Sequence, residues 1–128
     1  LYVESQYHRG RPYIGEYLDE VTGYWLKGDQ ERSRYYNHST FNDLMITGLI
    51  GLRPRLDNTI EVNPLIPVDN WDWICLDNVL YHGHNLTILW DKNGDRYHCG
   101  KGLRIFVDGK EVGYADTLTR IVCKDVLK

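Results

Sequence analysis

The sequence predicts a mainly β protein with a helical N-terminal part, followed by an antiparallel β-sandwich or β-sheet domain. Two patterns lead to this fold class. Between residues 40 and 52, apolar side chains recur three and four positions apart, as on the buried face of a helix. After residue 54, short apolar runs alternate with turn residues, which is typical of several antiparallel strands. We therefore divide the chain into residues 1–54 and residues 55–128.

The predicted helix, Thr40 to Leu52, is apolar around most of its circumference, and Gly51 and Pro54 supply its stop. A short helix that is apolar on more than one side belongs inside a larger helical assembly, because water would otherwise meet its apolar surface. We therefore expect a further segment to cover it. Its apolar side chains are Phe41, Leu44, Met45, Ile46, Leu49, Ile50 and Leu52.

The strands predicted in the second part are short. In the run at 85–90, Leu86, Ile88 and Trp90 fall two residues apart and therefore on one side of a strand, which indicates a buried face. Asn93-Gly94 and Asp108-Gly109 are residue pairs typical of tight hairpin turns, so each is expected to join two antiparallel strands. The predicted strands lie at residues 59–63, 71–80, 85–90, 103–107, 111–114 and 118–123.

Composition excludes several function classes. The chain has 128 residues and 15 Lys+Arg against 18 Asp+Glu, so it lacks the excess of positive charge that nucleic-acid binding requires. No apolar run approaches the roughly 20 residues that cross a bilayer. The three cysteines are too few and too widely spaced for a disulfide framework or a zinc knuckle. No glycine-rich loop has the spacing that cradles a phosphate, so we expect no cofactor and no metal.

Candidate chemistry is concentrated in residues 15–25, where carboxylates stand among aromatic rings. Sugar binding uses this combination, because a ring stacks on the C–H face of a pyranose while carboxylates accept protons from its hydroxyls. A carboxylate beside such rings, here Glu16, can also act as a general base on water. The residue types alone leave open a plain solvated loop.

Three stretches resemble the C-terminal end of (α/α)6-barrel glycoside hydrolases, in particular the mannosylglycerate-hydrolase-like and processing α-glucosidase I-like group. The first begins at Gly15-Glu16-Tyr17 and ends at Thr22-Gly23. The second comprises residues 37–44 and Gly48 to Pro54. The third, 62–67 with 73–83, is similar to the β-rich segment that follows the barrel in such enzymes.

This resemblance implies that the chain is the C-terminal piece of an inverting α-glycosidase. Residues 1–54 would then end the helical barrel, with the helix as its last helix, and residues 55–128 would form a β-rich C-terminal domain. Glu16 matches the general base. The acid partner would stand upstream of this chain, so the piece alone would be inactive. Export to the periplasm or outside the cell is expected from the family. The side chains expected to bind the carbohydrate substrate are Tyr17, Tyr24, Trp25, Asn37 and His38.

Other hypotheses remain open. The β-rich part can be a non-catalytic carbohydrate-binding or structural domain, with aromatic rings as a sugar platform, or a pure interaction domain. His82-Gly83-His84 resembles half of a metal site, but zinc needs a third and a fourth ligand. We expect one of these histidines to hydrogen-bond within the sheet and the other to meet solvent. The platform candidates are Trp71, Trp73, Tyr81 and Trp90.

Overall fold

The computed structural model describes residues 4–13, 15, 18–25, 40–67 and 69–128, in two compact units, Leu1–Thr40 and Phe41–Lys128. Antiparallel strands dominate the second unit, and one short helix precedes them. The prediction of a mainly β, antiparallel protein is thus confirmed. The helix shares a unit with the sheets, while the division of the parent protein at residue 54 stays a prediction.

The larger sheet has four antiparallel strands in the order of the chain: β5 (Trp73–Tyr81), β6 (His84–Asp91), β7 (Gly102–Val107) and β8 (Lys110–Ala115). Two of its connections are tight turns. Asp108 and Gly109 both have positive φ, 49° and 80°, as the predicted hairpin turn requires. His82 and Gly83, with φ of 52° and 85°, form the corresponding turn between β5 and β6.

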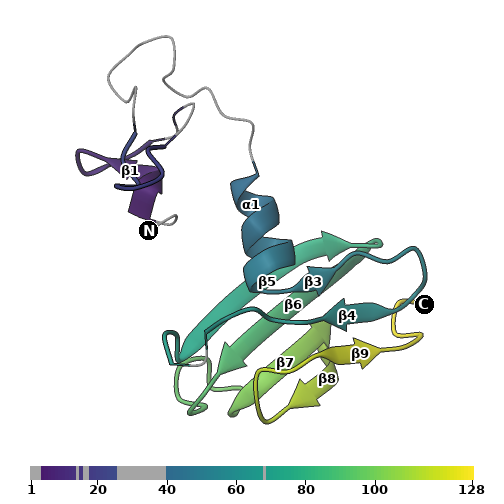
Figure 1. Ribbon diagram of the computed structural model, residues 1–128. Coiled ribbons are helices and arrows are strands. Elements are labelled where there is room, and N and C mark those ends of the chain that lie inside the picture. Colours follow the sequence, from purple (N-terminus) through teal and green to yellow (C-terminus); the bar gives the residue numbers. More distant parts are fainter. Residues whose placement is uncertain (1–3, 14, 16–17, 26–39, 68) are drawn as a thin grey trace. The chain divides into compact units, whose positions relative to one another are not determined.

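The smaller sheet has three strands in the order β3 (Leu52–Arg53), β4 (Ile60–Val62) and β9 (Ile121–Cys123). Its central strand, β4, pairs with β3 on one side and with the much later β9 on the other. Figure 1 shows this short sheet lying over one face of the four-stranded sheet. The two sheets form a β-sandwich around one core.

The core consists of the inward-facing side chains of both sheets. Leu86, Ile88 and Ile105 of the larger sheet are at most 2% exposed, and Ile60 and Val62 of the smaller sheet are fully buried. Burial of each such side chain contributes about 1.5–3 kcal/mol relative to exposure. The predicted buried side of residues 85–90, formed by Leu86, Ile88 and Trp90, therefore lies in this core.

The helix is shorter than predicted. It begins as α1 (Phe41–Asp43) and continues as the π-helical segment η3 (Leu44–Leu49), which closes with a 2.9 Å bond from the Ile50 N–H to the Met45 carbonyl. Gly51 then has a φ of +81°, and a Cβ there would lie 2.0 Å from the Asn63 carbonyl oxygen. Because the chain turns at this glycine, residues 52–53 form strand β3 instead of a last helical turn.

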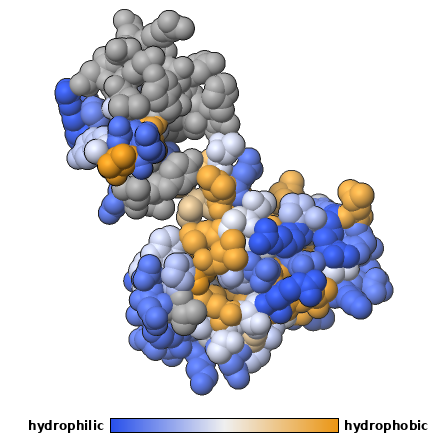
Figure 2. All heavy atoms as spheres, in the orientation of Figure 1, coloured by the Kyte–Doolittle hydropathy of each residue, from blue (hydrophilic) through white to orange (hydrophobic). Residues whose placement is uncertain are grey.

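The helix is only partly covered within the described residues. No residue of α1 or η3 is fully buried, and Leu44 is 51% exposed. Figure 2 shows apolar side chains gathered over the helix and the adjoining part of the sandwich. Of the residues that the structure describes, none belongs to a helix long and apolar enough to cross a membrane.

The first unit contains short elements in its described part. The 3₁₀ turn η1 (Glu4–Gln6) leads into a hairpin of β1 (Tyr7–His8) and β2 (Arg11–Pro12). Arg9 and Gly10, both with positive φ, turn this hairpin.

The prediction of a tight turn at Asn93-Gly94 is wrong. The connection between β6 and β7 is a loop over residues 92–101, folded around the buried carboxylate of Asp91. Its Oδ1 accepts the Gly94 N–H at 2.8 Å, and its Oδ2 accepts the N–H groups of Arg96 and Tyr97, each at 2.9 Å. A side chain that satisfies three backbone donors therefore determines the shape of this loop.

Candidate functional site

The predicted site residues fall into two groups. Glu16, Tyr17, Asn37 and His38 lie outside the described residues. Tyr24 and Trp25 are described, and both line a pocket in the first unit. The geometry around these two aromatic residues is therefore what the structure adds to the candidate site.

Tyr24 and Trp25 follow a turn that is stabilised by hydrogen bonds to Asp19. The Asp19 N–H donates to the Tyr24 carbonyl at 2.8 Å, and Leu18 forms an isolated antiparallel bridge with Trp25. The Asp19 carboxylate accepts the N–H groups of Val21 and Thr22, at 3.0 and 2.7 Å, and the Thr22 hydroxyl at 2.9 Å. These bonds, with that of the Thr22 N–H the strongest, hold the pKa of Asp19 below its ordinary value. Asp19 therefore has a structural role in this turn.

Aromatic rings pack beneath the turn. Tyr13 is 6% exposed, and its ring centroid lies 5.2 Å from that of His8 and 5.5 Å from that of Trp25. Gly15 is buried against the same rings, because a Cβ there would lie 2.7 Å from Trp25 Cε3 and 3.0 Å from Tyr13 Cε1. A larger residue than glycine would displace these rings.

Residues on both sides of Glu16 thus contact Trp25. Gly15, which precedes it, is buried against the indole, and Leu18, two positions after it, pairs with the backbone of Trp25. The sequence placed a carboxylate near these rings by spacing alone. The structure adds that Gly15 packs against the Trp25 indole and that Leu18 pairs with the Trp25 backbone.

The pocket has a volume of about 390 Å³, within the range of small-molecule sites. Two separate segments supply its walls, and the lining combines exposed aromatic rings with ionisable side chains. This mixture suits a ligand that has both C–H faces and hydroxyl groups. The lining residues are Glu4, Tyr7, His8, Arg9, Thr22, Gly23, Tyr24 and Trp25.

Sequence reasoning missed the wall formed by residues 4–9. Tyr7 is the one tyrosine of this segment, and nothing in the pattern indicated that the hairpin would face residues 22–25. Arg9-Gly10, which turns the hairpin, is not among the residue pairs that predict a tight hairpin turn. Tyr7, His8 and Arg9 are therefore additions that only the folded arrangement reveals.

The sugar platform suggested for the β-rich part does not form as one surface. Trp90 and Tyr81 are core residues, 5% and 8% exposed, and the Trp90 Nε1–H donates to the Trp71 carbonyl at 3.2 Å. Trp73 is 49% exposed, but the Arg96 guanidinium lies 4.2 Å from its ring centroid. A pyranose cannot stack on a ring face that a guanidinium already covers.

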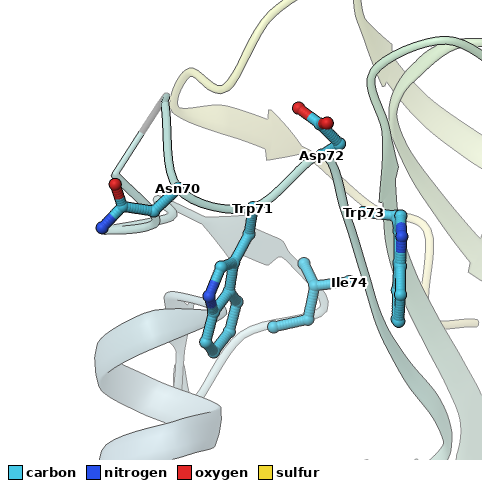
Figure 3. Close-up of a pocket in the computed structure, with 5 residues that line it drawn as sticks. All are labelled: Asn70, Trp71, Asp72, Trp73 and Ile74. Atoms are coloured by element: carbon cyan, nitrogen blue, oxygen red, sulfur yellow. The ribbon is translucent and has the colours of Figure 1, made fainter. Parts of the chain in front are cut away.

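A pocket of about 450 Å³ adjoins Trp73 (Figure 3), lined by Asn70, Trp71, Asp72, Trp73 and Ile74. In this view the side chain of Ile74 lies between the two indole rings, which therefore do not form one continuous platform. The Asp72 carboxylate forms a 2.9 Å ion pair with Lys92, which directly follows the neighbouring strand β6. This pocket is less suited to a sugar than the one in the first unit.

The two histidines of the β5–β6 hairpin have separate roles, as predicted. His84 Nδ1 lies 2.7 Å from the Asp108 carboxylate, whereas His82 is exposed in the turn. Within the described residues, no three His, Cys, Asp or Glu side chains are grouped as metal ligands. Cys75, Cys99 and Cys123 are free thiols.

The sandwich is similar to a known class of domain. Residues 52–113, from β3 into β8, match the family model described as "Glycosyl hydrolase family 65, C-terminal domain". The resemblance inferred from the sequence is therefore supported at the level of a glycoside-hydrolase C-terminal β-domain. The narrower group named there stays a prediction.

A solved structure resembles the chain over nearly its whole length. It is named "Sialidase", it is 90% identical in sequence, and the two superpose with a TM-score of 0.90. The match covers 98% of this chain and 12% of the solved chain. The present chain thus spans only a small share of that protein.

Proposed function

We propose that this chain belongs to a larger glycoside hydrolase that cleaves α-glycosidic bonds with inversion, and that Glu16 is its general base. The observation that carries the proposal is the contact that residues on either side of Glu16 make with Trp25, which lines a sugar-sized pocket: Gly15 packs against its indole, and Leu18 pairs with its backbone. The family match of residues 52–113 supports the enzyme class.

In this mechanism Glu16 removes a proton from a water molecule, which attacks the anomeric carbon from the face opposite the leaving group. Inverting enzymes separate base and acid by roughly 6.5–9.5 Å to make room for that water. The acid comes from the part of the parent enzyme outside this chain. Tyr17, Tyr24 and Trp25 contact the sugar ring, and Asn37 and His38 donate hydrogen bonds to its hydroxyls.

The helix α1–η3 acts in this proposal as the last helix of an (α/α)6 barrel. It is apolar around most of its surface, but none of its residues is fully buried. The solved relative is much longer than this chain, so a parent of similar length has enough residues to cover the helix. Residues of the parent barrel are the proposed cover.

The test compares Glu16→Gln with wild type in the full-length protein, on α-linked disaccharides and aryl α-glycosides. Loss of a general base lowers turnover by about 10²–10⁴-fold. The matched control is Glu20→Gln, an exposed carboxylate in the adjacent turn, which should change kcat less than about twofold. NMR of the first product from wild type should show the inverted anomer. Unchanged kcat in Glu16→Gln would contradict the proposal.

The name of the solved relative favours one further substrate class. Sialidases are glycoside hydrolases that use a tyrosine nucleophile in place of the usual carboxylate. An aryl sialoside therefore belongs in the same substrate panel. Cleavage of that substrate alone, with retention and without dependence on Glu16, would replace the first proposal with this one.

A further inference from the structure

The pocket of the first unit has two walls that come from different parts of the chain. Residues 4–9 form one wall and residues 22–25 the other. Tyr7 of the first wall is 61% exposed and Tyr24 of the second is 72% exposed. Each wall thus contributes one large ring that the fold leaves open to solvent.

Local bonds hold the first wall in place. Tyr7 pairs with Pro12 and His8 with Arg11 in the β1–β2 hairpin. Immediately after that hairpin, the Tyr13 N–H donates to the Gln6 carbonyl at 2.9 Å. The backbone of this wall is therefore held by hydrogen bonds at both ends of the hairpin.

Tyr13 connects this wall to the second one. Its buried ring contacts His8 on one side and Trp25 on the other, with centroid distances of 5.2 and 5.5 Å. The Asp19 turn fixes Trp25 and Tyr24 in their own segment. A pocket whose walls share a buried ring is largely formed before a ligand arrives, which lowers the entropy cost of binding.

The lining determines the chemical class of ligand. Tyr7 and Tyr24 offer faces for a C–H surface, and the same lining holds the carboxylate of Glu4 and the guanidinium of Arg9. A neutral pyranose presents both kinds of surface in a volume that 390 Å³ accommodates. Since the lining carries both signs of charge, it does not demand a charged ligand.

We propose that this pocket is a subsite for one neutral pyranose unit and that Tyr7 is a binding residue that stacks on it. The inference rests on and deepens the proposed function, because Trp25, which lines the subsite, contacts Gly15 and Leu18, the described residues before and after Glu16. It adds a wall, residues 4–9, that neither the sequence patterns nor the family match assigns.

The test is calorimetric binding of methyl α-D-glucopyranoside, methyl α-D-mannopyranoside and methyl α-D-galactopyranoside to the full-length protein. Binding does not require turnover, so this measurement is independent of the catalytic role of Glu16. Tyr7→Ala should raise the Kd of the best ligand about tenfold, the size expected for losing one aromatic contact. Tyr7→Phe, which keeps the ring, should lose less affinity than Tyr7→Ala. Circular dichroism of each variant verifies that it is folded.

The control is Val21→Ala, at a residue that is 83% exposed in the adjacent turn and outside the pocket lining. It should bind as wild type does. Wild-type affinity in Tyr7→Ala, or no binding of any of the three glycosides to wild type, would overturn the subsite.

The outcomes for Glu16 and Tyr7 are separable. If Glu16→Gln turns over normally while Tyr7→Ala binds weakly, the base lies elsewhere and the subsite stands. If Glu16→Gln is inactive while Tyr7→Ala binds normally, the proposed function stands and the subsite is wrong.

Discussion

Replacement of Asp91 should destabilise the sandwich by an amount that follows from its three hydrogen bonds. The side chain is 1% exposed, and its two oxygens accept the N–H groups of Gly94, Arg96 and Tyr97. A net hydrogen bond contributes about 1 kcal/mol, and more when the acceptor is charged. Because the loop is partly open to water, which can replace a lost acceptor, we use the lower figure. Asp91→Ala should therefore cost about 3 kcal/mol.

Asp91→Asn keeps the shape of the side chain but removes its negative charge, so it tests the contribution of the charge alone. The amide can turn its oxygen toward Arg96 and Tyr97, but its NH₂ group then faces the Gly94 N–H. We expect the free energy of unfolding to fall by about 1.5 kcal/mol. This value exceeds the cost of one lost hydrogen bond, because two N–H donors also face each other in the variant. Asp95→Ala, an exposed residue of the same loop, is the matched control and should change stability by less than about 0.5 kcal/mol.

The pH dependence gives a second signature. Burial alone would raise the pKa of the Asp91 carboxyl, but the N–H groups of the loop, that of Tyr97 first, hold it below the ordinary value of 3.8. A lowered folded-state pKa means that the carboxylate contributes its full stability above about pH 4 and loses it as the pH falls further. The difference between wild type and Asp91→Asn should therefore be constant from pH 7 to pH 5 and shrink below pH 4.

Urea unfolding followed by tryptophan fluorescence measures these differences. At a slope of about 1.5 kcal/mol per M, Asp91→Ala should lower the midpoint by about 2 M at pH 7. Equal midpoints for Asp91→Ala and Asp95→Ala would refute the role assigned to the carboxylate. A difference between wild type and Asp91→Asn that persists unchanged at pH 3 would refute the charge argument.

Two further predictions concern backbone and core. Gly51→Ala should destabilise the chain by about 3 kcal/mol or more in urea unfolding, because its Cβ would collide with the Asn63 carbonyl at a φ of +81°. Gly48→Ala is the control in the helix, where a Cβ meets nothing within 4 Å, and equal losses in both variants would contradict the steric argument. Tyr81→Phe keeps the buried ring but removes the hydroxyl that accepts the Arg55 N–H at 3.0 Å, so its melting temperature should fall by an amount equivalent to about 1 kcal/mol. An unchanged melting temperature would show that water replaces this acceptor.

The strands of the sandwich were predictable from the sequence where every second side chain points into the core and is apolar. Leu86, Ile88 and Trp90 recur every second residue because one face of β6 lies in the core, and this pattern is visible without a structure, although Leu89 between them is also buried. Strand β3 was not predictable, since two residues carry no periodicity. The prediction of helix up to Leu52 was wrong because Gly51 turns the chain one residue earlier.

Tertiary contacts overrode local patterns at two places. Asn93-Gly94 is a standard hairpin pair, but the buried Asp91 carboxylate binds three later N–H groups and forces a longer loop. Trp90 and Tyr81 were platform candidates by residue type, whereas the sandwich buries both. A prediction from residue type uses only the local sequence. The shape of this loop and the burial of these two rings depend on residues that are close in space.

The candidate site was predictable in kind and only partly in detail. Carboxylates among aromatic rings indicated sugar chemistry at residues 15–25, and Tyr24 and Trp25 do line a pocket. The opposite wall required the fold, because Tyr7 comes near Tyr24 only through the packing of Tyr13 between their segments.

The pairing of β4 with β9 has a consequence for synthesis of the protein. Ile60 is paired with Cys123, so one edge of β4 has no partner until about sixty more residues have been made. At about 5–20 residues per second, this interval lasts about 3–12 s on the ribosome. An unpaired strand edge is a template for association with other chains. The nascent protein therefore passes through a period of vulnerability to aggregation that ends when β9 emerges.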